Sequence, residues 1–424
     1  MTGDKLTVGI LVDSHYLPTS GGGFSYYQRL LQAINAYHWS DELEIINIVF
    51  DKSALRQEVL KKRVLLISKK YTHSVTYLFY KILYHLFYSF GKSRYKKRWL
   101  GAARRIQLLQ HKHTEQILAS NGIDLVYYLR PEETSMNYSF ITTHWDVGHR
   151  SMHAFPEVAL DGTYEVRENY YLQVLNKAFL IICESQTGAR ELMHYYAINP
   201  AKVKTVPLFS GGVVEQQVTA QEEMAILRKY GLEKDLFFLY PAQFWAHKNH
   251  YNLLHAFHAL QTKGKQNLKL MLCGSDKGNL AYIREQINRM ELSGQVILPG
   301  YISDKELHVF YKNALALVMP TFLGPTNIPL LEAAELGCPV LCSDLPGHRE
   351  MMEETALYFD PSSAANIERC LKKILDASLR KQLSTAARQQ IATSPFNLDK
   401  SLQVLENILL EAKPIRRAWG VSAG

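Results

Sequence analysis

Cysteine is scarce in this 424-residue chain, and its five cysteines are scattered. None stands in a CxxC pair or beside histidines, which argues against a structural zinc site and against a disulfide framework. This usage fits a reducing compartment, so we expect a cytoplasmic protein. The sequence also has no Asp-x-Asp pair and no cluster of His, Asp and Glu with ligand spacing. We therefore expect no metal ion and no other cofactor.

Long apolar runs are missing as well. A helix needs roughly 18 uncharged apolar residues to cross a bilayer. The longest candidate, Tyr77 to Phe90, is shorter and contains Lys81 and His85. The first 13 residues read as a short strand ending in an acid rather than as a signal peptide. We therefore expect no segment that spans a membrane.

The composition is that of a globular protein, with 47% hydrophobic and 21% charged residues. Its length is too great for one ordinary domain and suits two. The net charge of +8 and the pI near 9.0 favour anionic partners, such as diphosphates, acidic lipids or nucleic acid.

Short apolar runs alternate with helical patterns twice along the chain. The strand candidates are 5–12, 43–50, 124–129, 140–143 and 179–183, then 236–240, 268–273, 296–298, 316–319, 340–342 and 357–359. This alternation predicts the α/β class with two facing Rossmann-like domains and a cleft between them. The expected divisions are a first Rossmann-like domain at 1–208, a linker and connecting helix at 209–234, a second Rossmann-like domain at 235–396, and a final helix and tail at 397–424.

Three glycines, Gly21, Gly22 and Gly23, stand where the first expected strand gives way to a helix beginning near residue 25. Free N–H groups and the helix dipole attract phosphate at such a position, so the triplet is a candidate phosphate cradle. A flexible turn explains the glycines equally well.

Lys248 follows the first strand of the second half, within the segment YPAQFWAHKNH at 240–250. Ligands of open α/β sheets bind outside the carboxyl ends of the strands, where this lysine would neutralise a diphosphate leaving group. A solvated surface lysine is the alternative. Glu332 lies in the first turns of a helix expected from Ile328. A carboxylate there is a favourable dipole partner, and it is also suited to accept both hydroxyls of a ribose.

These segments together resemble the large group of retaining glycosyltransferases of the GT-B fold often called family 4. The resemblance spans nearly the whole chain and is most specific at 240–250, 272–275, 298–301, 320–340, 343–350 and 358–361. It implies that the second domain holds a nucleotide sugar, with Glu332 on the ribose and Lys248 on the diphosphate. The loop containing Thr326 and Asn327 would face the sugar. It also implies metal-independent chemistry.

The donor site departs from the family pattern at three places. Gly324 stands where a second glutamate is usual, the sequence Pro-Thr-Asn at 325–327 replaces Gly-Phe-Gly, and Gln243 replaces an arginine. These changes remove one contact to the donor sugar and one cation from the diphosphate site. Some bacterial surface-polysaccharide enzymes look similar at the Gly-Pro-Thr-Asn loop, so we interpret these changes as a variant site. An inactive relative is the alternative.

In the first half, a strand ending near Thr143 runs into a loop with His144, Asp146 and His149. Titratable groups at a strand end are candidates to contact the acceptor or the reacting sugar. The loop resembles the His-Asp segment of the same family, and Asp146 matches it best. The nearby residues 164–168 either support this loop or form an exposed helix face.

The segment 77–105 combines aromatic residues with a dense run of cations. The cations are Lys92, Arg94, Lys96, Lys97, Arg98, Arg104 and Arg105. One interpretation is a helix in the interface of an anionic membrane, and the other is a core helix followed by a solvated basic helix. No recognised nucleic-acid fold accompanies the charge, so we expect no nucleic-acid partner. The resemblance to enzymes acting on lipid-linked saccharides favours the inner face of the cytoplasmic membrane.

Together these patterns predict a retaining glycosyltransferase that moves a hexose from a nucleotide sugar to a saccharide or lipid-linked acceptor. The pathway implied by the resemblance is bacterial cell-surface polysaccharide or lipopolysaccharide assembly, with mannose or rhamnose as the donor sugar. The expected catalytic residues are Asp146, His149, His144 and Lys248. The expected donor-binding residues are Gly21, Gly22, Gly23, Gln243, Lys248, Thr326, Asn327 and Glu332. The rival hypothesis is an inactive homologue that binds a sugar or polymer as a partner subunit.

Overall fold

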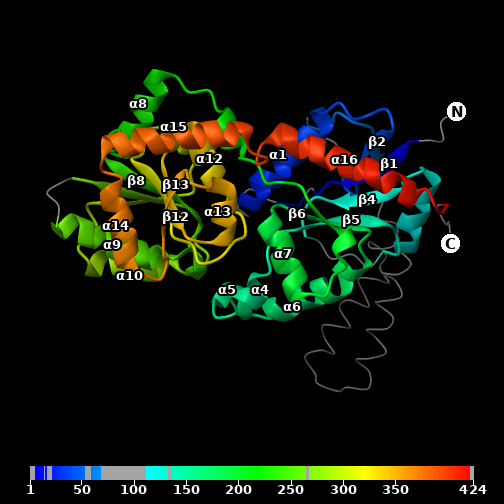
Figure 1. Ribbon diagram of the computed structural model, residues 1–424, viewed down its shortest axis with the longest axis horizontal. Helices are drawn as coiled ribbons and strands as arrows, with labels where there is room; N and C mark the ends of the chain where they lie inside the picture. The colour runs from blue at the N-terminus through cyan, green and yellow to red at the C-terminus, as the bar shows by residue number, and fades with distance from the viewer. Residues whose placement is uncertain are drawn as a thin grey trace, which may run out of the picture.

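Two parallel β-sheets, each covered by helices, make up the protein in a computed structural model (Figure 1). The structure describes residues 5–13, 15–16, 22–52, 59–67, 111–131, 136–263 and 267–420. The first sheet has the order β3-β2-β1-β4-β5-β6-β7, and the second has the order β10-β9-β8-β11-β12-β13. In each sheet the strand order changes direction beside the strand that comes first in the chain. The change lies between β1 and β4 in the first sheet and between β8 and β11 in the second. A ligand crevice forms at such a point, outside the carboxyl ends of the strands.

The first domain contains short strands and helices of mixed length. Its strands are β1 (Leu6–Leu11), β2 (Leu43–Val49), β3 (Val64–Leu66), β4 (Leu125–Tyr128), β5 (Phe140–His144), β6 (Leu180–Cys183) and β7 (Val203–Thr205). Its named helices are α1 (Gly22–Ala36), α4 (Gly148–Ser151), α5 (Pro156–Ala159), α6 (Thr163–Asn169), η3 (Tyr170–Val174), η4 (Leu175–Lys177), α7 (Gln186–Tyr195) and η5 (Pro200–Lys202). The expected sheet is therefore present, with two extra edge strands, β3 and β7.

The second domain repeats this plan with more regular helices. Its strands are β8 (Phe237–Pro241), β9 (Lys269–Cys273), β10 (Val296–Gly300), β11 (Ala316–Met319), β12 (Val340–Ser343) and β13 (Ala356–Phe359). Its helices are η7 (Ala246–Lys248), α9 (His250–Lys263), α10 (Leu280–Arg289), α11 (Asp304–Asn313), α12 (Ile328–Leu336), α13 (Pro346–Met352), α14 (Ala364–Lys373) and α15 (Ala377–Thr393). Central strands such as β11 and β12 are buried along their whole length, since helices cover both faces of the sheet.

The chain crosses between the domains twice. The first crossing contains η6 (Gly212–Glu215) and the capped helix α8 (Ala220–Lys229). The second leads into α16 (Leu398–Arg416), which lies across the first domain beside α1 and β4 (Figure 1). There Ser401 Oγ donates to Pro207 O at 2.7 Å, and Arg416 Nε donates to Asp124 O at 2.9 Å. The final helix thus ties the end of the second domain to the first.

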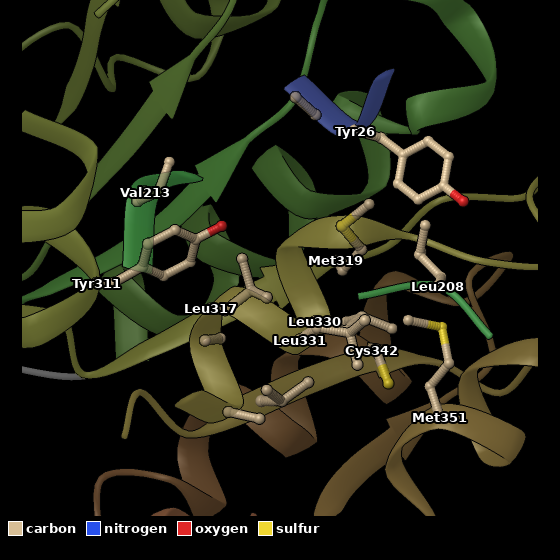
Figure 2. Close-up of a cluster of buried hydrophobic side chains, with 14 of the residues drawn as sticks. Tyr26, Leu208, Val213, Tyr311, Leu317, Met319, Leu330, Leu331, Cys342 and Met351 are labelled. Atoms are coloured by element: carbon tan, nitrogen blue, oxygen red, sulfur yellow. The ribbon is translucent and has the colours of Figure 1, made fainter. Parts of the chain in front are cut away.

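A cluster of buried apolar side chains lies where α1, the first crossing and the second sheet meet (Figure 2). Tyr26 comes from α1, Leu208 and Val213 come from the crossing, and Leu330 comes from α12. All four are nearly inaccessible to solvent. Burying apolar side chains from both domains together stabilises the contact between the domains.

The predicted fold class is confirmed, because both domains are Rossmann-like parallel sheets covered by helices. Helix α1 begins at Gly22 rather than near residue 25, so two of the three candidate glycines belong to its first turn. Gly21 and the segment 77–105 lie outside the described residues.

Candidate functional site

A cleft of about 1160 Å³ separates the carboxyl ends of the two sheets. The first domain contributes the start of α1, the loop after β5 and the residue after β6. The second domain contributes the loops after β8, β9 and β11 and the start of α12. The cleft therefore occupies the place where both sheets reverse their strand order, which is where this topology binds ligands.

Lys248 reaches the cleft from the turn η7 after β8. Its Nζ donates to Asn327 Oδ1 at 3.2 Å, and its carbonyl accepts from the Tyr240 hydroxyl at 2.7 Å. Burial lowers the pKa of Lys248 to about 8, although the carboxylates of Asp146 and Glu157 oppose this shift. The side chain remains mostly cationic at neutral pH and faces the cleft.

Asn249 holds the turn that carries Lys248. It adopts a left-handed backbone with a φ of 59°, and its Nδ2 donates to Pro320 O and Pro361 O, both at 2.8 Å. Asparagine tolerates this conformation better than most residues do. The amide therefore fixes the lysine turn against the loop after β11.

Asn327 connects the lysine to the second domain's interior. It precedes α12, and its Nδ2 lies 2.9 Å from His348 Nε2. The other ring nitrogen of His348 lies 2.8 Å from Ser343 O, so the ring donates from Nδ1 and accepts at Nε2. Burial lowers the pKa of His348 to about 4, which keeps this neutral form at physiological pH. The asparagine oxygen is thereby directed toward Lys248.

Glu332 lies on the inner side of α12 and is only 4% exposed, yet it lines the cleft. Its Oε2 accepts from the Tyr311 hydroxyl at 2.9 Å. A Cβ atom at Gly211 would overlap its Oε1, so a larger residue there would displace the carboxylate. Burial raises the pKa of Glu332 to about 7, with the Tyr311 hydroxyl opposing the shift.

The remaining predicted donor residues also line the cleft. Gln243 Oε1 accepts from Trp245 Nε1 at 3.0 Å, and Thr326 lies beside Asn327 in the loop after β11. Gly22 and Gly23 are the first residues of α1, and a Cβ atom at Gly23 would lie 2.6 Å from the Tyr16 hydroxyl. The structure thus brings the predicted donor residues of both domains together around one space, apart from the undescribed Gly21.

Asp146 belongs to the first-domain wall of the same cleft. Its Oδ1 accepts from Gly148 N at 2.7 Å and from Arg167 Nη2 at 2.6 Å. Although burial opposes the change, the Arg167 guanidinium lowers the pKa of Asp146 to about 2. The aspartate is therefore a fixed carboxylate, and Arg167 on α6 supports the loop directly.

His144 and His149 do not line the cleft, so the structure does not support them as groups that touch substrate. His149 is fully buried, with its Nε2 2.7 Å from the Tyr196 hydroxyl and 3.1 Å from a Glu168 oxygen. The Nδ1 of His144 lies 3.0 Å from the Tyr171 hydroxyl. Burial lowers the pKa of both rings to about 4.

The reason for this correction is the direction in which each side chain points. Successive side chains of a strand point to opposite faces, so the strand that directs His144 inward directs the next residue, Trp145, to the cleft. His149 is on the inner side of the short helix α4, against Tyr171 at a ring separation of 4.9 Å. Glu168 pairs with Arg150 beside this ring, so Glu168 supports the loop, whereas Glu165 and Val166 of the same helix are exposed.

Several charged residues that line the cleft were not predicted from the sequence, among them Glu184, Glu157 and Arg29. Glu184 follows β6 directly, Glu157 lies on α5, and Arg29 lies on the buried side of α1. Arg29 Nη1 donates to Ser210 Oγ at 2.7 Å, and its Nη2 pairs with Glu215 at 2.8 Å. Arg29 could have been found as a charged residue on the apolar face of a helix. Glu184 could have been found as a charged residue directly after a buried strand.

Several of these side chains join the two domains. The Glu157 carboxylate contacts the His247 ring and accepts from His247 N at 2.8 Å. Glu350 on α13 accepts from Gln186 N and Thr187 N, both at 2.7 Å, at the start of α7. The domains are therefore closed onto each other around the cleft.

Within the described ranges, no group of three or more His, Cys, Asp or Glu residues has a geometry suited to a metal ion. The five cysteines are buried and unbonded to one another. No described helix has the length and apolar character needed to cross a bilayer.

Comparison with known proteins finds similarity over part of this chain. Residues 223–390 match the family described as Glycosyl transferases group 1. The O-antigen chain mannosyltransferase B of Escherichia coli is 24% identical over 58% of this chain and 64% of its own length. The O-antigen chain mannosyltransferase RfbU of Salmonella typhimurium is 25% identical over 59% of this chain and 69% of its own. The match thus spans about two thirds of each of these curated relatives.

A solved structure shares the fold over nearly the whole chain. The Anabaena protein HepE, crystallised with UDP and glucose, superimposes with a TM-score of 0.65 at 13% identity, covering 96% of this chain and 100% of HepE. This likeness confirms the GT-B arrangement of two Rossmann-like domains. The segment 223–390, which matches the Glycosyl transferases group 1 model, includes the second of these domains from β8 to β13.

Proposed function

We propose that this chain, whose residues 223–390 match the Glycosyl transferases group 1 model, transfers a hexose from a nucleotide sugar to a saccharide or lipid-linked acceptor. The observation that carries the proposal is Lys248, a cation held at the carboxyl end of β8 inside the cleft between the domains. Glu332 stands on α12 of the same domain and lines the same cleft. These two groups suit the diphosphate and the ribose of one donor.

The reaction we propose begins with departure of the nucleoside diphosphate. Lys248 and the N-termini of α1 and α12 would stabilise its growing negative charge without a metal ion, because helix starts carry positive partial charge. The acceptor hydroxyl would then form its bond to the sugar on the same face, so the anomeric configuration would be retained. Asp146 would contact the acceptor or the reacting sugar from the first domain.

We propose mannose as the transferred sugar and surface-polysaccharide assembly as the setting. The support is that both relatives are named O-antigen chain mannosyltransferases. HepE, whose structure holds UDP and glucose, has the same fold and supports a nucleotide sugar as the donor class.

A panel of nucleotide sugars, with transfer and hydrolysis measured in excess EDTA, tests the proposal. We expect turnover with at least one donor, unchanged by EDTA, and an α-to-α or β-to-β outcome by NMR. Activity that EDTA abolishes and Mg²⁺ or Mn²⁺ restores would contradict the metal-independent mechanism.

Gly324 and Gln243 favour a second candidate function, an inactive homologue that binds a sugar or polymer as a partner subunit. Gly324 has a φ of 125° and presents no side chain, and the Gln243 amide is bonded to Trp245. This candidate predicts saccharide binding without transfer or hydrolysis for every donor in the panel.

We also propose that the protein works at the inner face of the cytoplasmic membrane, through the basic aromatic segment 77–105. Cationic segments bind anionic lipids in a manner that salt weakens. We expect the protein to pellet with anionic liposomes, less so as salt is raised. Charge reversal of Lys96, Lys97 and Arg98 should abolish pelleting, whereas equal recovery with neutral liposomes would contradict the proposal.

A further inference from the structure

Glu184 is a buried carboxyl group that reaches the cleft from the first domain. It directly follows β6 and precedes Ser185, whose side chain caps α7. It is 8% exposed and lines the cleft. Its Oε2 accepts from Thr326 Oγ1 at 3.1 Å, across the gap between the domains.

The surroundings of Glu184 differ from those of Asp146 and Glu157, the other two acids that reach the cleft from the first domain. Asp146 is paired with Arg167, and Glu157 contacts His247, but within the described part of the chain Glu184 has no ion-pair partner. Burial raises the pKa of Glu184 to about 8, with the Thr326 hydroxyl opposing the shift. A carboxyl group in this state both donates and accepts hydrogen bonds near neutral pH, and leaving that capacity unused in a buried site costs free energy.

The position of Glu184 relative to Lys248 indicates which part of a bound nucleotide sugar would lie beside Glu184. Thr326, which contacts Glu184, is the neighbour of Asn327, which contacts Lys248. A diphosphate beside Lys248 would place the sugar bonded to it against this loop. Residues 323–327 of this loop carry no charged side chain. Glu184 is a carboxyl group from the opposite domain that already contacts the loop at Thr326.

We propose that Glu184 hydrogen-bonds a hydroxyl group of the transferred sugar from across the cleft, so that the first domain takes part in recognising the donor. This inference rests on the proposed function, since it requires the sugar of a nucleotide sugar beside Lys248. Glu184 is then a specificity-determining residue, because a buried group that loses its hydroxyl partner is left unpaired.

The competing explanation is that Glu184 only holds the domains together through Thr326. Glu350 is a matched control for that role. It also joins the domains, through Gln186 and Thr187 at the start of α7, but it does not line the cleft. A variant that weakens domain closure alone should affect every ligand of the cleft alike.

Calorimetric titration of the full chain with GDP-mannose, UDP-glucose, GDP and UDP distinguishes the two roles. For Glu184→Gln and Glu184→Ala we expect the affinity for the nucleotide sugar that binds wild type to fall about 10- to 100-fold. The affinity for the matching nucleoside diphosphate should change less than twofold. Glu350→Gln should leave the ratio of the two affinities at its wild-type value.

Two results would overturn the inference. One is an equal loss of affinity for the nucleotide sugar and the free diphosphate in the Glu184 variants, as a closure contact requires. The other is no loss for either. Glu184→Gln keeps the shape of the side chain and an oxygen for Thr326, so it decides the question if Glu184→Ala does not fold. A wild-type protein that binds none of the four probes would instead refute the proposed function itself.

Discussion

The lysine turn after β8 and the histidine loop after β5 are built alike but placed differently. Each follows a buried parallel strand and carries titratable side chains, yet Lys248 lines the cleft and His149 is fully buried. The turn is held from outside by Asn249, which leaves its cation directed at the cleft. The loop folds back onto η3 and α7, whose tyrosines surround the histidine. A strand end therefore marks where a ligand binds, and local packing decides which side chain meets it.

The largest effect should come from Lys248→Ala. In the proposed reaction, Lys248 faces a leaving group whose negative charge grows as the glycosidic bond breaks, so its interaction would strengthen along the reaction. We expect kcat to fall by about 10² to 10³, the scale for losing one preorganised charge-stabilising group. Lys277→Ala is the control, because that lysine lies over the Trp245 ring and does not line the cleft. A Lys248→Ala enzyme with near-normal kcat would show that the diphosphate binds elsewhere.

Glu332→Gln should act on binding rather than on turnover. A carboxylate that accepts ribose hydroxyls does so equally in the ground and transition states, so the loss appears in KM. We expect KM for the donor to rise about 10- to 100-fold, from roughly 1.5 to 3 kcal/mol of charge-assisted hydrogen bonding. Glu335→Gln, on the same helix but absent from the cleft lining, should leave KM unchanged. A fall in kcat with KM unchanged would contradict the ribose assignment.

Asp146→Asn tests the cleft side of the first-domain loop. The substitution keeps the shape but removes the charge paired with Arg167 at 2.6 Å. We expect kcat to fall about tenfold, with nucleoside diphosphate affinity within twofold of wild type, because the nucleotide belongs to the other domain. Steady-state kinetics and calorimetry together measure both quantities. Parallel losses in the two would place Asp146 in the nucleotide half of the site.

The pH dependence of kcat/KM should also reflect the protonation of Lys248. Lys248 must be protonated to act, and its pKa is lowered to about 8 by burial. Activity should therefore show no loss from this group below pH 8 and fall about tenfold per unit above it. In Lys248→Arg the guanidinium stays charged, so this alkaline fall should move to higher pH at whatever activity remains. An unchanged alkaline fall in that variant would assign it to another group.

The smallest effect on catalysis should come from His149→Ala, although this substitution should lower the stability of the folded state. The ring fills a buried space and bonds to Tyr196, so its removal leaves a cavity and an unpaired hydroxyl. We expect a loss of about 2 to 4 kcal/mol in stability, seen as a lower apparent Tm, with kcat within twofold of wild type. The exposed His153→Ala should change neither. A large loss of kcat with an unchanged Tm would instead show that His149 has a role in catalysis.

The fold was largely predictable because its signals are local. Apolar runs such as Leu180–Cys183 indicate strands buried on both faces, and a capped stretch such as Ala220–Lys229 indicates a helix. The strands β3 and β7 escaped prediction, since three residues at a sheet edge carry too little pattern to be recognised. The start of α1 was placed late because its first two residues, Gly22 and Gly23, carry no side chain and so show no helical pattern.

The sequence alone determined that two parallel α/β domains would form, because periodicity and strand length are properties of neighbouring residues. It also placed Lys248 after a strand end and Glu332 near a helix start, whereas their roles on a diphosphate and a ribose came from the family resemblance and remain predictions. Only the tertiary structure decided that His149 is buried, that Asp146 is held by Arg167, and that Glu184 meets Thr326 from the opposite domain. Such contacts join residues far apart in the chain, and side-chain direction at a turn depends on what packs against it. No local pattern encodes either property.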